Sequence, residues 1–159
     1  MLSRIAIVVG AVLLVVAVVA LTFVIGMRRK SRPVLDAVRR MNRALLNPRQ
    51  MKSAGTPGAY ASIVRHTGRR SGRPYETPVV ATPIEGGFVI ALPYGRRSDW
   101  LRNVLAAGSA TIVHEGGEYR VGGPELLAME TAEEWFPEKD RRGHRMFGVD
   151  TALRVRSAA

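Results

Sequence analysis

The segment Gly68–Arg73, which reads Gly-Arg-Arg-Ser-Gly-Arg, is the part of the chain whose residue types most clearly suggest chemistry. Glycine permits backbone conformations in which several N–H groups point to one side, and such a concavity binds anions. Arginine adds planar, paired donors that match the oxygens of a phosphate. A phosphate site is therefore one interpretation of this segment. A solvated hairpin tip in an arginine-rich protein is an equally good one.

Two motifs that use glycine and serine do not fit this segment. The phosphate loop of nucleotide hydrolases needs Gly-Lys-Ser/Thr before a helix, and a hydrolase nucleophile needs the frame Gly-x-Ser-x-Gly, which Ser71 lacks. The chain has no cysteine, which excludes thiolate chemistry, and its three histidines lie far apart without metal-ligand spacing. We therefore expect no metal site, and the sequence does not indicate catalytic residues.

A second cluster, Pro93–Asn103, combines a basic turn with an aromatic residue and an amide. Ser98 can cap a helix that starts at Asp99, and the N-terminus of a helix favours an anion. Trp100 and Asn103 are one helical turn apart, so an indole ring and an amide could lie beside a planar ligand. The simpler interpretation, in which Trp100 only anchors the core, has similar weight.

Short β-rich runs with turn signals between them surround both clusters. Glycine-rich turns at 85–87 and 115–118 predict hairpins, and Gly108 is expected to end the helix that begins at Asp99. The expected strands are Tyr60–His66, Thr77–Ile84, Phe88–Leu92, Ala110–His114, Tyr119–Val121 and Glu125–Met129. This spacing, with one inserted helix, predicts a mainly β fold with helices, in the form of a small antiparallel barrel.

The N-terminal segment is apolar enough to cross a membrane. Residues 5–26 carry no charge, and Thr22 is the only polar side chain among them. As a helix this run is about 33 Å long, which covers a hydrocarbon core of about 30 Å. We favour an uncleaved transmembrane anchor over a signal peptide, because the run exceeds the roughly 7 to 15 apolar residues of a signal peptide.

The charges around this helix predict its orientation. Arg4 precedes the helix, and seven basic residues follow it closely, namely Arg28, Arg29, Lys30, Arg32, Arg39, Arg40 and Arg43. By the positive-inside rule the N-terminus lies outside and the C-terminal domain is cytoplasmic, at the cytoplasmic membrane. The cluster accounts for much of the net charge of +11 and predicts attraction to anionic membrane lipid rather than to nucleic acid.

A second helix is expected from Pro33 to about Leu46. Its apolar residues Val34, Val38, Met41 and Leu45 share one face. This face suits a helix that lies on the bilayer and, equally, a helix that packs on the domain. Asn47-Pro48 is expected to end the helix, and the residues up to Gly58 are expected to form a linker.

Blocks of sequence in this order resemble the deazaflavin-dependent nitroreductases of actinobacteria. The blocks are Thr67–Gly72, Thr77–Val79, Tyr94-Gly95 and Asp99–Gly108, with a Gly-Gly turn and a strand between the second and the third. The resemblance covers about residues 42–130. It implies a split β-barrel of the flavin-reductase and FMN-binding type, with coenzyme F-420 as cofactor, a deazaflavin that carries a phosphate and a glutamate-rich tail.

The resemblance also implies which residues hold the cofactor. The loop Gly68, Arg69, Arg70, Ser71 and Gly72 would hold the phosphate and the acidic tail. Thr77, Pro78, Tyr94 and Gly95 would border the ring, with Trp100 and Asn103 on the supporting helix. The chain departs from the family pattern where Tyr75 stands in place of an arginine, and it has no tyrosine after Glu130 to close a substrate pocket.

Four parts are therefore expected along the chain. They are a transmembrane anchor (1–27), a basic juxtamembrane helix with its linker (28–58), the cofactor-binding split β-barrel (59–130) and a C-terminal extension without assigned structure (131–159).

The function that the resemblance implies is transfer of a hydride from reduced coenzyme F-420 to a lipophilic acceptor such as a quinone or a nitroaromatic compound. A membrane-bound module that holds the cofactor without turnover is one alternative. A basic protein that binds anionic lipid or nucleic acid is another, although few aromatic residues lie among its arginines. FMN is the alternative cofactor. The sequence does not indicate the oligomeric state.

Overall fold

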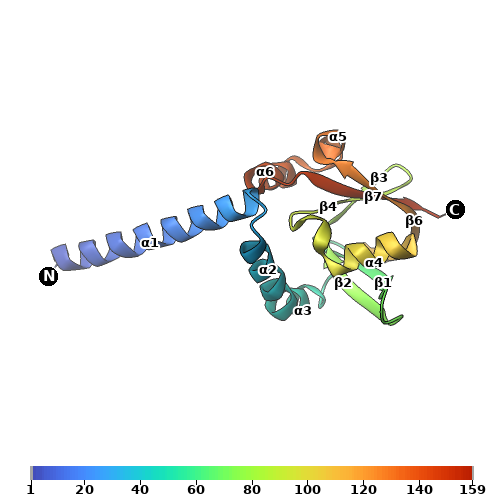
Figure 1. Cartoon of the computed structure of the whole chain (residues 1–159), viewed down its shortest axis with the longest axis horizontal. Coiled ribbons are helices and arrows are strands. Elements are labelled where there is room, and N and C mark those ends of the chain that lie inside the picture. The colour runs from blue at the N-terminus through green and yellow to red at the C-terminus, as the bar shows by residue number, and fades with distance from the viewer. Residues whose placement is uncertain (1, 159) are drawn as a thin grey trace.

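The computed structural model describes residues 2–158, which form one curled antiparallel sheet with helices on both faces and a long helix that projects from it (Figure 1). The strands are β1 (Ser62–Thr67), β2 (Pro74–Val79), β3 (Ala81–Ile84), β4 (Gly87–Ala91), β5 (Ser109–His114), β6 (Gly117–Ala128) and β7 (Thr151–Ser157). The helices are α1 (Leu2–Arg28), α2 (Arg32–Met41), α3 (Asn47–Gln50), α4 (Asp99–Ala107), α5 (Met129–Ala132) and α6 (Glu138–Phe147). Shorter helical turns are η1 (Asn42–Leu46), η2 (Gly95–Arg97) and η3 (Glu133–Trp135). The expected mainly β fold with helices is confirmed.

The sheet is rolled up by one extended segment that supplies both of its edges. The strand order is β2-β1-β5-β6-β7-β4-β3, so β2 and β3 lie at opposite ends although only Val80 separates them in sequence. The sequence analysis expected one strand, Thr77–Ile84, and this was wrong. Proline cannot donate to a neighbouring strand, so Pro78 and Pro83 suit two edge strands that meet at a bend.

The two expected hairpins and the helix end are confirmed. Ile84 faces Gly87 across the first turn and His114 faces Gly117 across the second, which leaves two residues in each loop. The second glycine-rich turn has positive φ at both central residues, the conformation that favours glycine at the second position. Gly108 ends α4 with a φ of 70°.

Strands near the C-terminus differ from the expectation. The expected strands Tyr119–Val121 and Glu125–Met129 are one strand, β6, which is interrupted by a bulge between Gly122 and Glu125. The segment 131–159, which has no assignment from sequence, supplies α6 and β7. Strand β7 lies between β6 and β4, so the sheet extends beyond the range 59–130.

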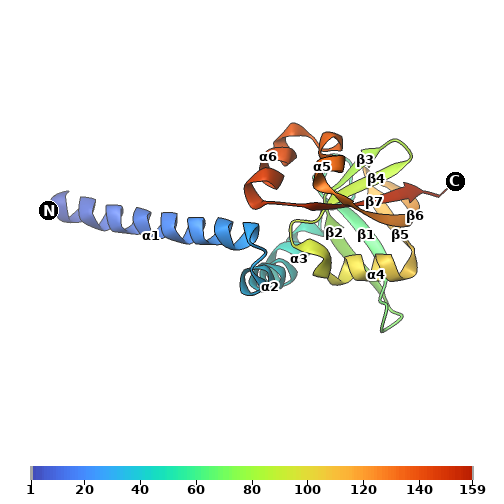
Figure 2. The same cartoon turned by 45° about the horizontal axis from the view of Figure 1, so that its top comes forward.

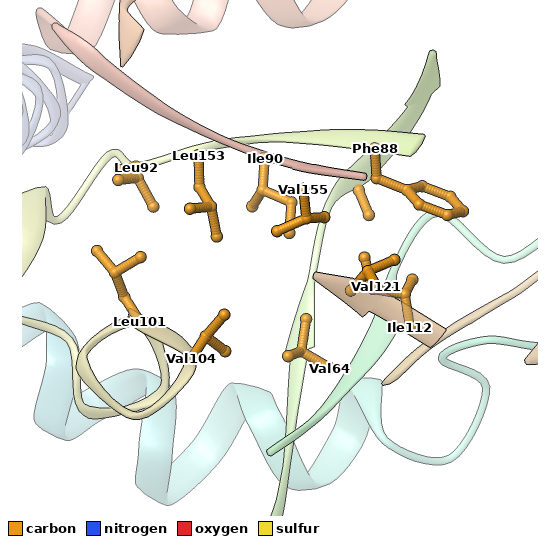
Figure 3. Close-up of a cluster of buried hydrophobic side chains, with 11 residues drawn as sticks. Val64, Phe88, Ile90, Leu92, Leu101, Val104, Ile112, Val121, Leu153 and Val155 are labelled. Atoms are coloured by element: carbon orange, nitrogen blue, oxygen red, sulfur yellow. The ribbon is translucent and has the colours of Figure 1, made fainter. Parts of the chain in front are cut away.

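The main core lies inside the curl of the sheet. Leu101 and Val104 of α4 point toward Ile90, Leu153 and other side chains of the inner face, as Figure 3 shows. Leu101 and Leu153 are almost completely buried. This helix therefore fills the open side of the curl.

A second cluster covers the outer face of the sheet. Val89 of β4 and Ala152 of β7 pack against Met129, Ala132 and Phe136, from the α5–η3 region. Figure 2 shows α5 and α6 on the side of the sheet opposite to α4. Strands β4 and β7 therefore have apolar side chains on both faces.

The N-terminal helix leaves the domain as an isolated rod (Figure 1). Residues Arg4–Arg28 have a length that could span a membrane; the most apolar stretch among them has a mean hydropathy of 3.1, and none of that stretch is buried by the rest of the described chain. At its C-terminal end, Met27 joins Leu35 and Val38 of α2 in a small buried cluster.

The helix that follows does not end at Asn47-Pro48 as expected. Helix α2 widens into the π-helical turn η1, in which the amide N of Asn47 donates to the carbonyl of Asn42, and Pro48 then lies in the first turn of α3. A proline needs no partner for its missing N–H there. The expected linker is packed as well, because Ala54 is buried and the amide of Gly55 donates to the Ala61 carbonyl over 2.7 Å.

Two leucines of α4 test the inward face of this helix. We expect Leu101→Ala to lower the free energy of unfolding by about 2 to 5 kcal/mol, because it leaves a cavity in the main core. Leu105→Ala removes the same atoms from a side chain that is 37% exposed, and should change that free energy by less than about 0.5 kcal/mol. Denaturant titration of the full chain in detergent, followed by tryptophan fluorescence, measures both values. Equal losses would contradict the packing of α4.

Candidate functional site

The glycine and arginine segment forms a closed hairpin tip between β1 and β2. The amide of Gly68 donates to the carbonyl of Arg73 and the amide of Gly72 donates to that of Gly68, each over 2.8 Å. A Cβ at Gly68 would come within 2.5 Å of the Ser71 hydroxyl oxygen, and Gly72 has a φ of 66°. Both glycines are therefore needed for the shape of the loop.

Arg69 points inward and ties this loop to α4. Its amide N and its guanidinium both donate to Oδ1 of Asn103, over 3.1 and 2.8 Å. The guanidinium also donates to Asp99 over 3.1 Å, and the side chain is only 19% exposed. Two predicted site residues, Arg69 and Asn103, are thus in direct contact.

The amide of Asn103 continues the network into the sheet. Its Nδ2 lies 3.1 Å from Nδ1 of His66, and Nε2 of His66 lies 3.1 Å from the Thr77 hydroxyl. A guanidinium can only donate, so Oδ1 must face Arg69 and Nδ2 must face His66. Nδ1 of His66 is therefore the acceptor, and Nε2 carries the proton and donates to Thr77.

The environment keeps His66 neutral. Burial lowers the pKa of His66 below its ordinary value, and the negative charge of Asp99 offsets only part of that effect. Partial burial raises the pKa of Asp99, but the hydrogen bonds and charges of Arg69 and Arg43 outweigh it and hold that pKa below its ordinary value. A protonated His66 would present a second donor to Asn103, so the geometry and the pKa direction agree.

The other arginines of the loop are free. Arg70 and Arg73 are exposed, and neither side chain pairs with a carboxylate within residues 2–158. They extend from a loop whose backbone is fixed at both ends by hydrogen bonds. Such a loop can offer two guanidiniums to an anion without first breaking an internal ion pair.

The remaining predicted site residues lie elsewhere around α4. Trp100 packs against the main core, and the Tyr94 hydroxyl accepts a hydrogen bond of 2.7 Å from Asn42 of η1. Gly95 begins η2 with a φ of 68°, and Pro78 faces Ile63 across the first two strands. Ser98 precedes α4, but its side chain makes no capping bond, so that expectation was wrong. Within residues 2–158, hydrogen bonds join the loop to Asn103 and, through His66, to Thr77, and none joins it to Tyr94 or Trp100.

An open groove of about 950 Å³ lies beside the stem of the loop. Among the residues that line it are His66, Tyr75, Ser109, Arg120 and Gly122. The ring of Tyr75 stacks on that of His66 with a centroid distance of 5.9 Å and an interplanar angle of 19°. This pair offers a flat aromatic surface at the groove, next to the free arginines.

His66 and Tyr75 were not among the residues predicted for the site. A signal existed in the sequence, because both residues flank the same glycine loop between two expected strands. Within the part of the chain that is described, no group of three or more acidic or histidine side chains could hold a metal ion.

Comparison with known proteins places this geometry in context. A family model described as F-420H(2)-dependent quinone reductase matches residues 38–154, which is more than half of the chain. The search of curated proteins gives no match.

Several solved structures are similar to the chain. One is described as an F-420-H2 dependent reductase; it has 14% sequence identity and a TM-score of 0.45, and the match covers 60% of this chain and 93% of the other. A conserved hypothetical protein from Mycobacterium tuberculosis has 12% identity and a TM-score of 0.48, with 64% and 75% covered. The heme storage protein HutZ from Vibrio cholerae has 10% identity and a TM-score of 0.46, with 63% and 82% covered.

The neutral state of His66 predicts how stability depends on pH. Its pKa is lower in the folded chain than in the unfolded chain, so the unfolded state binds the proton more readily. The contribution of His66 is therefore complete above the unfolded pKa of about 6.5 and decreases as the pH falls below it. Nitrogen NMR of the imidazole should show a pKa below that value and a proton on Nε2.

The variant His66→Asn is the matched control, because its amide oxygen can still accept from Asn103 but does not titrate. Stability between about pH 7 and pH 5 should fall less in this variant than in the unaltered chain. His144 contributes to the pH dependence of stability in both proteins, since burial also lowers its pKa. An unchanged slope, or a proton found on Nδ1, would contradict the tautomer assignment.

Proposed function

The chain belongs to the F-420H(2)-dependent quinone reductase family, and on that premise we propose that it is a membrane-anchored enzyme that transfers a hydride from reduced coenzyme F-420 to a lipophilic acceptor such as a quinone. Membership makes it a deazaflavin-dependent oxidoreductase with coenzyme F-420 as its cofactor. The membrane location, the acceptor and the residues of the site are the parts that we propose.

The observation that carries the proposal for the site is the fixed loop with two unpaired guanidiniums. The cofactor itself carries the hydride, so the protein has to bind and orient it. Arg70 and Arg73 suit the negative charges of a phosphate and an acidic tail. Arg69 is already committed to Asn103 and Asp99, and we assign it the task of fixing the loop.

The groove beside the loop suits a planar ring. The stacked rings of His66 and Tyr75 provide an aromatic surface, and the wide opening leaves room for an acceptor. Thr77 does not line the groove, but it supports it from behind through its hydrogen bond with His66. Pro78, Tyr94 and Gly95 remain predictions for the border of the ring, and Trp100 remains a prediction for the supporting helix.

The curled sheet supports the finer proposal that the fold is a split β-barrel of the flavin-reductase type. Strands β2 and β3 form opposite edges and are joined through Val80, which brings the two edges of the sheet together.

The membrane location rests on α1. Its apolar stretch has no contact that buries it, so it does not serve as a core helix of this chain. Its last turns belong to the domain, because Phe23 lies edge-on against Phe147 of α6 at a centroid distance of 6.1 Å. Together with the basic residues after it, this supports an uncleaved anchor with the domain on the cytoplasmic side.

The proposed role of the free arginines can be tested by binding. We expect Arg70→Ala to weaken binding of coenzyme F-420 by about 10- to 150-fold, because loss of a charged hydrogen bond costs about 1.5 to 3 kcal/mol. Arg142→Ala removes an exposed guanidinium of α6 that pairs with Glu138, and should leave the affinity within about twofold. Fluorescence titration of the full chain in lipid nanodiscs measures both.

The acceptor is tested in the same nanodiscs with the reduced coenzyme. Addition of a soluble quinone such as menadione should oxidise the coenzyme. In Arg70→Ala the rate of this oxidation should fall at low coenzyme concentration and partly recover at high coenzyme concentration. Saturable binding without oxidation would reject the quinone as acceptor and retain the binding site. Equal affinities of the unaltered chain, Arg70→Ala and Arg142→Ala for the coenzyme would reject the proposed binding site.

A further inference from the structure

The first helices after α1 expose an apolar stripe at the surface of the described chain. The apolar stripe consists of Met41, Leu45 and Leu46, which are 45%, 54% and 40% exposed. They follow one another around the end of α2 and along η1. Three large apolar side chains at one place on a surface commonly mark a binding face.

The contacts of α2 show which way this stripe faces. Leu35 and Val38 pack with Met27 and the ring of Tyr94, so their side of the helix faces the domain. Val34 packs against the same cluster and also contacts Gly26 of α1, where an added Cβ would come within 2.6 Å of it. Met41 lies two helical turns after Val34 and about one turn after Val38, on the same side of the helix. The apolar stripe therefore continues the apolar side of α2 beyond the residues that α1 and the domain bury.

The direction of α1 indicates what lies next to the apolar stripe. Figure 1 shows α1 projecting away from the domain while α2 turns off beside its base. A bilayer crossed by α1 would begin at that base, and α2 would run along its surface. The proposal below rests on the proposed anchor for this reason.

A second helix reaches the same base from the other side. The Arg28 guanidinium donates to the carbonyls of Arg145 and Met146 at the end of α6, over 2.9 and 3.2 Å. Met146 is 50% exposed. Apolar side chains thus project on both sides of the point where α1 leaves the domain.

Basic side chains border the apolar stripe. Arg40 is exposed on α2, and Arg29 and Arg32 are exposed at the start of the same region, whereas Arg43 of η1 pairs with Asp99. Arginines beside exposed apolar residues are typical of helices that lie in the headgroup layer, with apolar groups about 5 to 10 Å deep and charges at the phosphates. This complementarity favours lipid over a second protein chain.

We propose that α2 and η1 lie in the headgroup layer of the membrane, with the apolar stripe inserted among the acyl chains and the bordering arginines at lipid phosphates. The domain then has a fixed height above the bilayer. Asn42 and Arg43 connect this helix to Tyr94 and Asp99, over 2.7 and 3.4 Å, so the segment between β4 and α4 lies next to the lipid surface.

Spin labelling tests this placement cleanly because the chain contains no cysteine. Nitroxides are attached singly to Met41→Cys and Leu45→Cys in the full chain, in nanodiscs of phosphatidylcholine and phosphatidylglycerol. The accessibility of each label to oxygen and to a water-soluble nickel chelate is measured. We expect both labels to favour oxygen at least several-fold more than a label at Glu85→Cys in the distant hairpin.

A label at Val15→Cys, in the middle of α1, separates this proposal from the proposed anchor. If the label at 15 favours oxygen but the labels at 41 and 45 are as accessible to the nickel chelate as the label at 85, the proposed placement of α2 is wrong. The proposed anchor would then still stand. Labels at 41 and 45 shielded from both reagents, with a pair distance between two copies, would show a protein partner and also overturn it.

Discussion

The carboxamide of Asn103 is the group on which the arrangement of the site depends. A buried amide has one accepting and one donating end, and an end left without a partner costs about 1 to 3 kcal/mol. The only donors at Oδ1 come from Arg69, within residues 2–158, so the other end must meet an acceptor. That requirement sets the tautomer of His66, whose Nε2 then donates to the Thr77 hydroxyl. One side chain of α4 thereby positions the loop and the neighbouring strand.

This constraint divides the arginines of the loop by task. Arg69 and Arg70 are neighbours with the same chemistry, yet one is drawn into the network and the other is left exposed. A loop already held by Asn103 has less conformational entropy to lose when an anion binds to its free arginines. In the proposed site, the internal ion pair of Arg69 with Asp99 would therefore serve binding indirectly, by fixing the loop that carries Arg70 and Arg73. Composition alone could not distinguish these roles.

The parts that could be predicted from sequence are those decided by neighbouring residues. Helix α4 and both hairpins were predicted because Gly108 and the glycines of the turns adopt backbone conformations that few other residues accept. Strand β7 was missed because Arg154 and Arg156 interrupt the apolar pattern of a strand that is buried on both faces. The strands that flank it, β4 and β6, are distant in sequence. The importance of His66 was also missed, since its partner Asn103 lies 37 residues away. Such contacts follow from the closure of the sheet, which no local pattern encodes.

Asp99 links the loop to the helix on the proposed membrane side. Its carboxylate accepts from Arg69 of the loop and from Arg43 of η1, and it is the first residue of α4. An exposed ion pair contributes only about 0 to 1 kcal/mol, so this link adds little stability. Its value is geometric: the loop, α4 and the membrane-side helix share one reference point. An enzyme that receives its acceptor from lipid has more need of a constant distance between site and bilayer than of a strong contact, and in the proposed arrangement the shared carboxylate at the start of a rigid helix would help to set that distance.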